Sequence, residues 1–115
     1  MKVLFHIDKG ENWPEIISNL KNMIAIKQNM RSDIQVEVVV NGTAVKNLVD
    51  NEHDTNLYES LKEATTAGFK VMACNNSLER FKVAANDIFA FVEVVPVGVL
   101  EIVAKENKGF AYIRP

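Results

Sequence analysis

The sequence contains a single cysteine, Cys74, in 115 residues, and this scarcity excludes several kinds of protein. One cysteine cannot form a disulfide within the chain, complete a structural zinc site by itself, or build a C-x-x-C redox pair. Long apolar runs are also missing, since no segment approaches the roughly 20 apolar residues of a membrane span. A disulfide scaffold, a zinc module, a dithiol oxidoreductase and a transmembrane protein are therefore not expected.

A strong charge of either sign is missing as well. Lysine and arginine number 13 against 15 acidic residues, which gives a net charge of -2 and a pI near 5.7. Direct binding to nucleic acid is not expected, because no basic field attracts a phosphate backbone. The hydrophobic fraction of 48% and the charged fraction of 24% are those of an ordinary globular chain, and we expect one domain over residues 1–115.

The familiar nucleotide and hydrolase motifs do not occur either. There is no G-x-G-x-x-G or G-x-x-x-x-G-K-[ST] loop for phosphate and no G-x-S-x-G nucleophile elbow, so no cofactor is expected. The opening run Val3-Leu4-Phe5 is too short for the core of a secretory signal, because His6 and Asp8 interrupt it. We therefore expect a cytoplasmic protein, whose lone thiol stays reduced.

What is present is an alternation of two kinds of segment: short apolar runs, and segments whose apolar residues have helical spacing. Branched apolar runs bounded by turn residues predict strands, and apolar residues three or four apart predict helices. We expect strands over 3–7, 34–40, 69–74, 89–95 and 110–113. We expect helices between them, over 13–27, 44–49, 57–64, 78–81 and 97–105. This alternation predicts a three-layer α/β fold with a mostly parallel sheet and helices on both faces.

Residues that follow the expected strands are the candidates for function. In open α/β sheets, ligands bind beyond the carboxyl ends of the strands. The candidates at these ends are His6, Asp8, Asn41, Gly42, Cys74, Asn75, Asn76, Ser77, Pro96 and Gly98. Of these, only Cys74 is a nucleophile of any strength near neutral pH.

Cys74 is the leading chemical candidate, and two interpretations of it are open. It precedes Asn75-Asn76-Ser77, a run of helix-capping residues, and the free N–H groups and dipole of a helix N-terminus lower the pKa of a thiol. A thiolate there can accept a sulfur atom and pass it on. The alternative is that Cys74 is a small buried apolar residue, which is the commonest role of free cysteine.

The two histidines raise further possibilities. His6 and Asp8 lie two apart on an expected strand and so point to one face, where His6 could act as a base beside Cys74. The alternative that we favour is a partly buried His6 bonded to a backbone carbonyl, with Asp8 capping the next loop. The run Glu52-His53-Asp54 has no second histidine at ligand spacing, so we expect a solvated loop and no metal site.

Six segments of the sequence resemble the DsrE/DsrF-like family, and they are spread over the whole chain in the right order. The segments are Lys2-Val3-Leu4-Phe5-His6-Ile7-Asp8, Trp13-Pro14, Val38-Val39-Val40-Asn41-Gly42-x-Ala44-Val45, Ala73-Cys74-Asn75-Asn76-Ser77-Leu78, Val94-Val95-Pro96-Val97-Gly98-Val99 and Lys108-Gly109-Phe110-Ala111-Tyr112-Ile113-Arg114-Pro115. In particular, the chain is similar to the small, single-domain branch of that family, whose members have no assigned reaction.

The resemblance implies a flavodoxin-like three-layer sheet that assembles into homotrimers or hexamers. Better-understood relatives are sulfur-relay proteins, in which a cysteine takes up persulfide sulfur and hands it to a partner protein. Cys74 matches the position of their cysteine motif. The function expected from the resemblance is a persulfide carrier with Cys74 as acceptor. From the residues themselves we expect N-terminal donors at Asn75, Asn76 and Ser77 to stabilise the thiolate or persulfide, and His6 is a candidate neighbour that could tune the thiol.

Two other kinds of function stay open, so the sequence does not decide whether the chain is an enzyme. One is a non-catalytic ligand-binding or assembly module, and the other is hydrolase or transferase chemistry through Cys74, His6 and Asp8. Aromatic residues are dense in the C-terminal third, where they fill either the core or an interface between subunits. They are Phe81, Phe89, Phe91, Phe110 and Tyr112.

Overall fold

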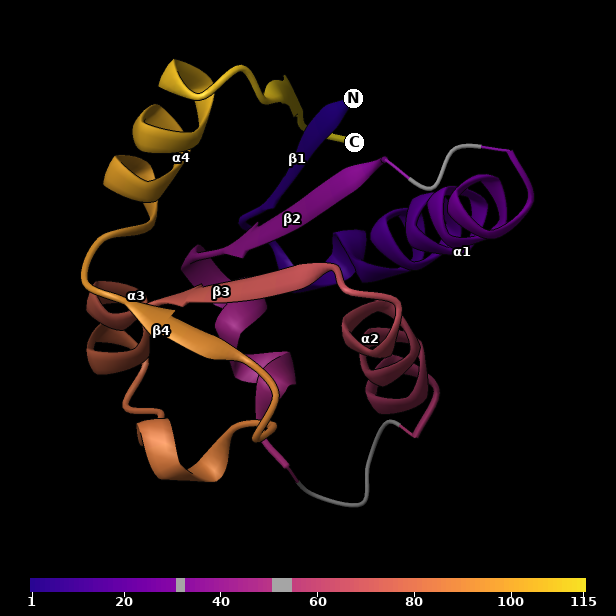
Figure 1. Cartoon of the computed structure of the whole chain (residues 1–115). Coiled ribbons are helices and arrows are strands. Elements are labelled where there is room, and N and C mark those ends of the chain that lie inside the picture. Colours follow the sequence, from indigo (N-terminus) through magenta and orange to yellow (C-terminus); the bar gives the residue numbers. More distant parts are fainter. Residues whose placement is uncertain (31–32, 51–54) are drawn as a thin grey trace.

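The computed structural model describes residues 1–30, 33–50 and 55–115. Its centre is a sheet of five strands that all run parallel, in the order β4-β3-β2-β1-β5. The strands are β1 Lys2–Ile7, β2 Gln35–Val40, β3 Lys70–Cys74, β4 Glu93–Val95 and β5 Ala111–Ile113. Because they run in one direction, their carboxyl ends lie along one edge of the sheet and their amino ends along the other (Figure 1).

Helices cover both faces of the sheet, but unequally (Figure 1). The α-helices are α1 Trp13–Asn29, α2 Thr55–Thr66, α3 Asn75–Arg80 and α4 Gly98–Asn107, and the 3-10 helices are η1 Gly10–Asn12, η2 Gly42–Leu48 and η3 Ala85–Asp87. The first face packs against α1, α2, α3 and η2, whereas α4 is the only α-helix of the described residues on the second face. No described helix is both long and apolar enough to cross a membrane. The three-layer α/β fold expected from the sequence is confirmed.

The direction in which the chain adds strands to the sheet changes after β4, so that β1 has β2 on one side and β5 on the other. From β1 the chain steps outward through β2 and β3 to β4, and it then returns across the sheet to add β5 on the far side of β1. A right-handed crossover in the opposite direction puts its helix on the opposite face, which explains why α4 lies on the second face. The flavodoxin order is 2-1-3-4-5, so this sheet has the layers of the flavodoxin fold with a different strand order.

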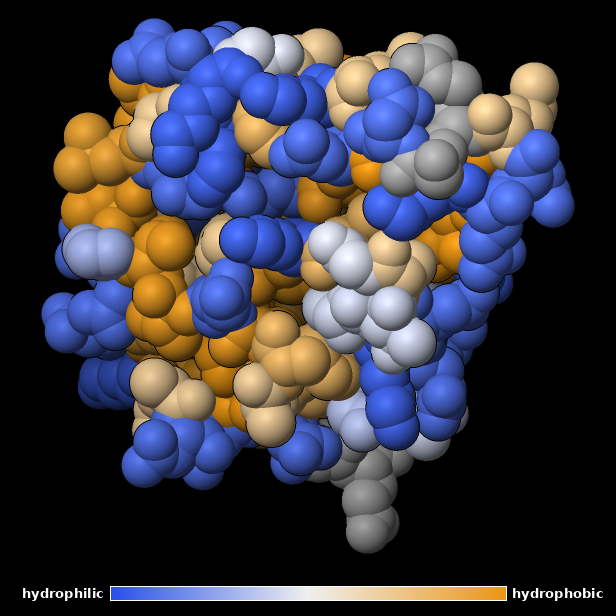
Figure 2. Space-filling model, viewed as in Figure 1, coloured by the Kyte–Doolittle hydropathy of each residue, from blue (hydrophilic) through white to orange (hydrophobic). Residues whose placement is uncertain are grey.

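The two faces of the sheet have cores of different size. On the first face, branched residues of β1, β2 and β3 pack against the apolar sides of α1 and α2. On the second face, the core of the described residues consists of Leu4, Val39, Met72 and Ile102. This small core leaves apolar side chains of α4 exposed, among them Leu100 at 64%. Figure 2 shows the resulting hydrophobic surface over α4 and the neighbouring end of the sheet.

Two expected elements differ in the structure. The strand expected over 89–95 is reduced to β4, because Phe89 and Phe91 pack with Tyr58 of α2 at ring-centroid distances of 5.2 and 5.6 Å. This aromatic packing takes the chain away from the sheet until Glu93. The helix expected over 44–49 is η2, a 3-10 helix whose apolar residues are buried against the first face.

A carboxyl group is buried on the second face of the sheet. Glu37 of β2 is 2% exposed, and its Oε1 lies 3.1 Å from Nζ of Lys105 of α4. The same Nζ lies 2.7 Å from Oε2 of Glu101. Burial, followed by the neighbouring Glu101 carboxyl, raises the pKa of Glu37 from 4.5 to about 7 against the opposing effect of Lys105. Contact with Glu37 lowers the pKa of Glu101, so Glu37 is the member of the pair that holds a proton.

We predict that Glu37→Gln flattens the pH dependence of stability between about pH 4.5 and pH 7. The folded protein holds the Glu37 proton more tightly than the unfolded chain does. Unfolding therefore releases this proton within the window, and the stability falls as the pH rises, by an amount on the order of 3 kcal/mol. Glutamine has a similar shape and no proton to lose. Urea unfolding at about pH 5 and about pH 7.5 measures the difference, and an unchanged pH dependence in the variant would contradict the raised pKa.

Candidate functional site

The candidate residues gather along the carboxyl edge of the sheet, where β1 to β4 end (Figure 1). Cys74 is the last residue of β3 and pairs with Val95 of β4. It is also the N-cap of α3, with an extended backbone and no side-chain capping bond. The capping run expected at Asn75-Asn76-Ser77 is therefore wrong in position, because β3 continues directly into α3 and these residues form the first turn of the helix.

The Cys74 thiol is surrounded by hydrogen-bond donors. The residue is 4% exposed, and burial alone raises the pKa of the thiol. The nearby Ser77 hydroxyl and the nearby backbone N–H groups of Gly98, Ser77 and Asn76 act against burial, and the pKa of Cys74 is lowered below its ordinary value. Such donors act by stabilising the charged form. The site therefore makes the thiol more acidic than an ordinary cysteine although it is shielded from water.

The Ser77 hydroxyl is oriented by the end of the neighbouring strand. The backbone N–H of Gly42 donates to Oγ of Ser77 at 2.9 Å. This bond occupies a lone pair of the oxygen and leaves the hydroxyl hydrogen free to point at Cys74. Gly42 has a φ of +58°, and a Cβ there would overlap the carbonyl oxygen of Asp8, so the close approach requires glycine.

Gly98 brings the start of α4 against the thiol. A Cβ at Gly98 would lie 3.2 Å from the Cβ of Cys74, closer than ordinary van der Waals contact. The absence of that atom lets the backbone of Gly98 approach Cys74 closely, and its N–H acts to lower the pKa of the thiol. Pro96 precedes Gly98 in the loop between β4 and α4, and its carbonyl oxygen accepts the N–H of Asn76 at 3.4 Å. The loop from β4 to α4 therefore lies directly beside the thiol.

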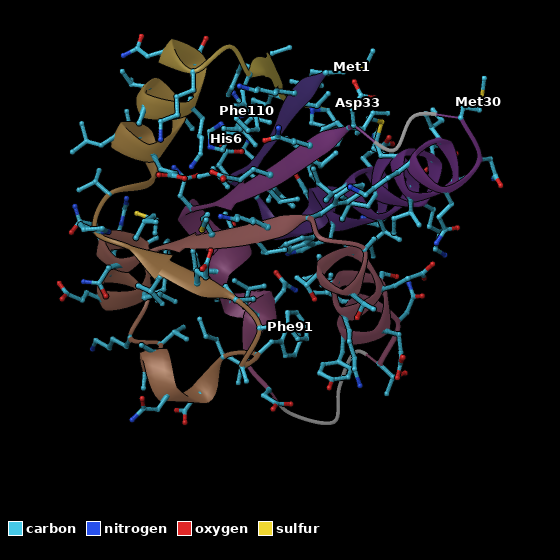
Figure 3. The ribbon with its side chains drawn as sticks, in the orientation of Figure 1. Met1, His6, Met30, Asp33, Phe91 and Phe110 are labelled. Carbon is cyan, nitrogen blue, oxygen red and sulfur yellow. The ribbon has the colours of Figure 1, made fainter. Side chains whose placement is uncertain are left out.

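His6 belongs to a second hydrogen-bonded group, on the α4 side of the sheet (Figure 3). Its Nε2 lies 2.8 Å from Oδ1 of Asn41, and its Nδ1 lies 2.6 Å from the Tyr112 hydroxyl. Since the Asn41 oxygen can only accept, Nε2 donates and Nδ1 accepts from Tyr112. β2 separates β1 from β3, so the two strands lie about 10 Å apart. Both nitrogens are engaged, and the His6–Cys74 pair that hydrolase or transferase chemistry requires is not formed.

Asp8 forms an ion pair that the spacing of the sequence did not reveal. Nη2 of Arg114 lies 3.0 and 3.2 Å from the two carboxylate oxygens of Asp8. This pair and the His6–Tyr112 contact lie where β5 returns beside β1, at the reversal of the strand order. Arg114 and Tyr112 are 106 residues from their partners, so only the strand order brings them together.

The remaining candidates do not add a metal site or a further contact to the thiol. Nδ2 of Asn75 donates to Oε1 of Glu79 at 3.1 Å within α3, so this side chain is engaged on its own helix. No group of three His, Cys, Asp or Glu side chains within residues 1–30, 33–50 and 55–115 is placed to hold a metal ion. The run Glu52-His53-Asp54 lies outside the described residues.

Comparison with known families places the chain in a recognised group of proteins. A model of the DsrE/DsrF-like family matches residues 1–115. The chain belongs to the DsrE/DsrF-like family. That family is associated with sulfur relay. A search of curated proteins found no match.

Solved structures of other proteins have the same fold. A protein of unknown function, MTH1491 from Methanobacterium thermoautotrophicum, is 32% identical with a TM-score of 0.83, and the match covers 99% of this chain and 98% of that one. The ychN protein from E. coli is 14% identical with a TM-score of 0.70, and both chains are covered fully, at 100%. A conserved protein of unknown function, BT1422 from Bacteroides thetaiotaomicron, is 16% identical with a TM-score of 0.76, with 99% and 94% covered. The last two likenesses show the fold alone.

We predict that Ser77→Ala slows alkylation of Cys74 at neutral pH by about threefold to tenfold. The variant lacks one donor to the thiolate, and hydrogen bonds to charged groups contribute about 1.5–3 kcal/mol. The higher nucleophilicity of a less acidic thiol offsets part of the lost thiolate fraction. Labelling with iodoacetamide over a range of pH measures the effect, with Asn75→Ala as the control because Asn75 bonds to Glu79. A Ser77→Ala profile equal to that of the parent would show that the hydroxyl does not act on the thiol.

Proposed function

We propose that the protein is a persulfide sulfur carrier in which Cys74 takes up a sulfur atom and passes it on. The observation that carries the proposal is the buried position of Cys74 at the start of α3, against Gly98, with its pKa lowered by the nearby Ser77 hydroxyl and N–H groups. Donors of this kind stabilise a thiolate and a persulfide anion alike. Membership of a family associated with sulfur relay supports the same function.

The transfer balances without an external oxidant or reductant. The Cys74 thiolate attacks the outer sulfur of a donor persulfide, R–S–SH. The S–S bond of the donor breaks, a new S–S bond forms on Sγ of Cys74, and the donor leaves as its thiolate. An acceptor nucleophile then attacks the same outer sulfur and releases Cys74 as a thiolate, which the surrounding donors stabilise again. In the proposal, donor and acceptor are partner proteins.

Burial of Cys74 restricts how a donor reaches the sulfur. The thiol is 4% exposed, and the exposed residues Asn76 and Pro96 flank it. A donor therefore approaches between the start of α3 and the loop from β4 to α4. Exclusion of water also protects a bound persulfide from side reactions.

The alternative function is a non-catalytic ligand-binding or assembly module in which Cys74 only fills space. The burial of the residue, 4% exposed, favours this alternative. It predicts that the native thiol reacts slowly and that the rate varies little with pH. A carrier predicts fast labelling with an apparent pKa below the ordinary value of about 8.5.

We predict that incubation of the reduced protein with glutathione persulfide adds one sulfur atom, which dithiothreitol removes. Intact mass spectrometry measures the adduct. Cys74→Ser is expected to gain no sulfur, and Asn75→Ala is expected to behave as the parent because its side chain does not contact the thiol. Failure of the parent to form the adduct, or an adduct that persists in Cys74→Ser, would refute the carrier function.

We also propose that the protein assembles as a homotrimer or homohexamer in the cytosol. Val99, Leu100 and Val103 of α4 are 56%, 64% and 49% exposed, and Figure 2 shows a hydrophobic surface over α4. A second copy of the chain would cover this surface, since exposed apolar patches mark interaction sites. The cytosol is proposed because a reducing compartment keeps the single thiol free for transfer.

We predict that Leu100→Glu reduces the mass in solution toward that of one chain, 12.9 kDa. A charge buried between subunits without a partner weakens association strongly. Light scattering after size-exclusion chromatography measures the mass. Met30→Glu is the matched control, because Met30 is a 79% exposed apolar residue at the end of α1. A monomeric parent, or a Leu100→Glu variant with the mass of an oligomeric parent, would contradict this assembly.

A further inference from the structure

The helix α4 presents one narrow stripe of residues to the sheet. Gly98, Ile102 and Lys105 follow one another at spacings of four and three, so they lie on one side of the helix. Among the described residues, Ile102 is the one residue that α4 contributes to the buried core of the second face. The contact of Lys105 with Glu37 of β2 lies toward the end of the same stripe. A single apolar side chain and a polar cluster therefore hold α4 on the sheet.

The polar cluster contains two carboxyl groups and one ammonium group. Nζ of Lys105 lies 3.1 Å from Oε1 of Glu37 and 2.7 Å from Oε2 of Glu101. The two carboxyl groups are also in hydrogen-bond contact with each other. If both were ionised, the cluster would carry a net negative charge where Glu37 is only 2% exposed. Two carboxyl groups this close do not readily ionise together, so we expect them to share one proton.

The second carboxyl oxygen of Glu37 indicates where that proton sits. Oε2 of Glu37 is buried, and no donor among the described residues reaches it. An ionised oxygen in that position would be costly, whereas a protonated one donates its own hydrogen to Glu101. The Glu101 side chain is the more exposed of the two, at 16% against 2%, so it holds the negative charge more easily. The raised pKa of Glu37 and the lowered pKa of Glu101 agree with this placement.

The other elements around Glu37 supply no second ion pair. Its registered neighbour on β1 is apolar, and Lys70, its registered neighbour on β3, is exposed. Lys2 and Lys108 lie at the same edge of the sheet, where Nζ of Lys2 donates to the carbonyl oxygen of Lys108 at 3.0 Å. Within residues 1–30, 33–50 and 55–115, Lys105 alone lies at ion-pair distance from Glu37.

We propose that α4 is a proton-linked latch over Cys74, closed while Glu37 and Glu101 share a proton and loosened when that proton leaves. The helix has only 10 residues, so its two ends move together. At its other end, a Cβ on Gly98 would lie 3.2 Å from Cβ of Cys74. Loss of the proton to water leaves two carboxylates facing one ammonium group, and Gly98 then withdraws from the thiol. Segments with few buried apolar contacts open most readily, which makes α4 suited to this movement.

The latch gives a buried thiol a route to its sulfur donor. Cys74 is 4% exposed, and withdrawal of Gly98 uncovers the side of the thiol that α4 covers. As a means of admitting a donor, the latch rests on the proposed carrier function. As a movement of α4, it is independent of that function.

The latch opens as the pH rises. Closed, it raises the pKa of Glu37 from 4.5 to about 7, and opening exposes this carboxyl to water and returns its pKa toward the ordinary value. The closed form thus binds the proton more tightly, so closure is favoured at low pH and weakens until the pH passes about 7. Between about pH 6 and about pH 8.5 the opening equilibrium increases by about tenfold, nearly all of it below pH 7.

Hydrogen–deuterium exchange of the full chain, read by mass spectrometry on peptides from α4, tests the latch. Parent and Glu37→Gln are compared at the same pH, at about pH 6 and about pH 8.5, so that the intrinsic pH dependence of exchange cancels. The glutamine amide donates to Glu101 and has no proton to lose, so the variant stays closed. We expect the ratio of the parent rate to the variant rate to rise by about tenfold from the lower pH to the higher. The same ratio at both pH values would overturn the latch.

Two further glutamine substitutions on α4 separate a shared proton from a general effect of charge. Glu101→Gln removes the second carboxyl and supplies an amide donor to Glu37, so we expect it to abolish the pH dependence as well. Glu106→Gln is the matched control, because it removes an exposed carboxyl from the same helix, and we expect it to behave as the parent. Persistence of the pH dependence in Glu101→Gln, or its loss in Glu106→Gln, would overturn the shared proton.

Iodoacetamide labelling of Cys74 tests whether the latch acts on the thiol. We expect the ratio of the parent rate to the Glu37→Gln rate to rise by about threefold or more between the same two pH values. An unchanged ratio would overturn the connection between α4 and the thiol. Cys74→Ser is expected to show the parent exchange of α4, because the latch does not use the sulfur. Failure of the parent to take sulfur from glutathione persulfide contradicts the carrier function alone, since neither measurement involves sulfur transfer.

Discussion

The parallel pairing of β1, β2 and β3 is the constraint on which the rest of the structure depends. Parallel neighbours cannot be joined by tight turns, so each strand must be followed by a crossover that returns the chain to the same edge. The carboxyl ends of the strands therefore lie along one edge. Cys74 lies there near Gly42 and Gly98, although both are far from it in the sequence. The amino ends meet in the same way, which places Lys2 near Lys70. One rule of connection thus produces two edges with different chemistry.

The helix α4 links these two edges, because it is the only α-helix of the described residues on its face of the sheet. Its first residue, Gly98, packs closely against Cys74, and its last turn brings Lys105 to the buried Glu37. The core beneath it is small, so the contact of Lys105 with Glu37 of β2 is prominent among its contacts with the sheet. A buried ion pair stabilises little in net terms, since desolvation offsets its attraction. We infer that the contact of Lys105 with Glu37 mainly fixes the position of α4 along the sheet and contributes less to the stability of the fold.

Local patterns in the sequence were sufficient for the layers, the parallel sheet and the place of Cys74 at a strand end. Those features follow from branched runs, helical spacing and turn residues, which act over a few neighbours. The strand expected over 89–95 is shorter in the structure. Phe89 and Phe91 are residues that strands favour, but they pack with Tyr58 of α2 instead. Glu37 lies between valines in an alternating strand, and nothing nearby in the sequence shows that α4 will cover it. Arg114 and Tyr112 meet Asp8 and His6 only because β5 returns beside β1.

The groups that act on Cys74 likewise come partly from residues near it in the sequence and partly from residues far from it. The Ser77 hydroxyl and the N–H groups of Asn76 and Ser77 follow from the junction of β3 with α3, whereas the Gly98 N–H depends on the whole β4–α4 connection. Burial and donation act in opposite directions on the pKa, and here donation prevails. A core cysteine has burial without donors, and a surface cysteine exchanges its donors with water. At this site fixed dipoles replace water around the sulfur, so a negative charge can develop there with little reorganisation. That distinguishes Cys74 from His6, whose two nitrogens are already occupied by Asn41 and Tyr112.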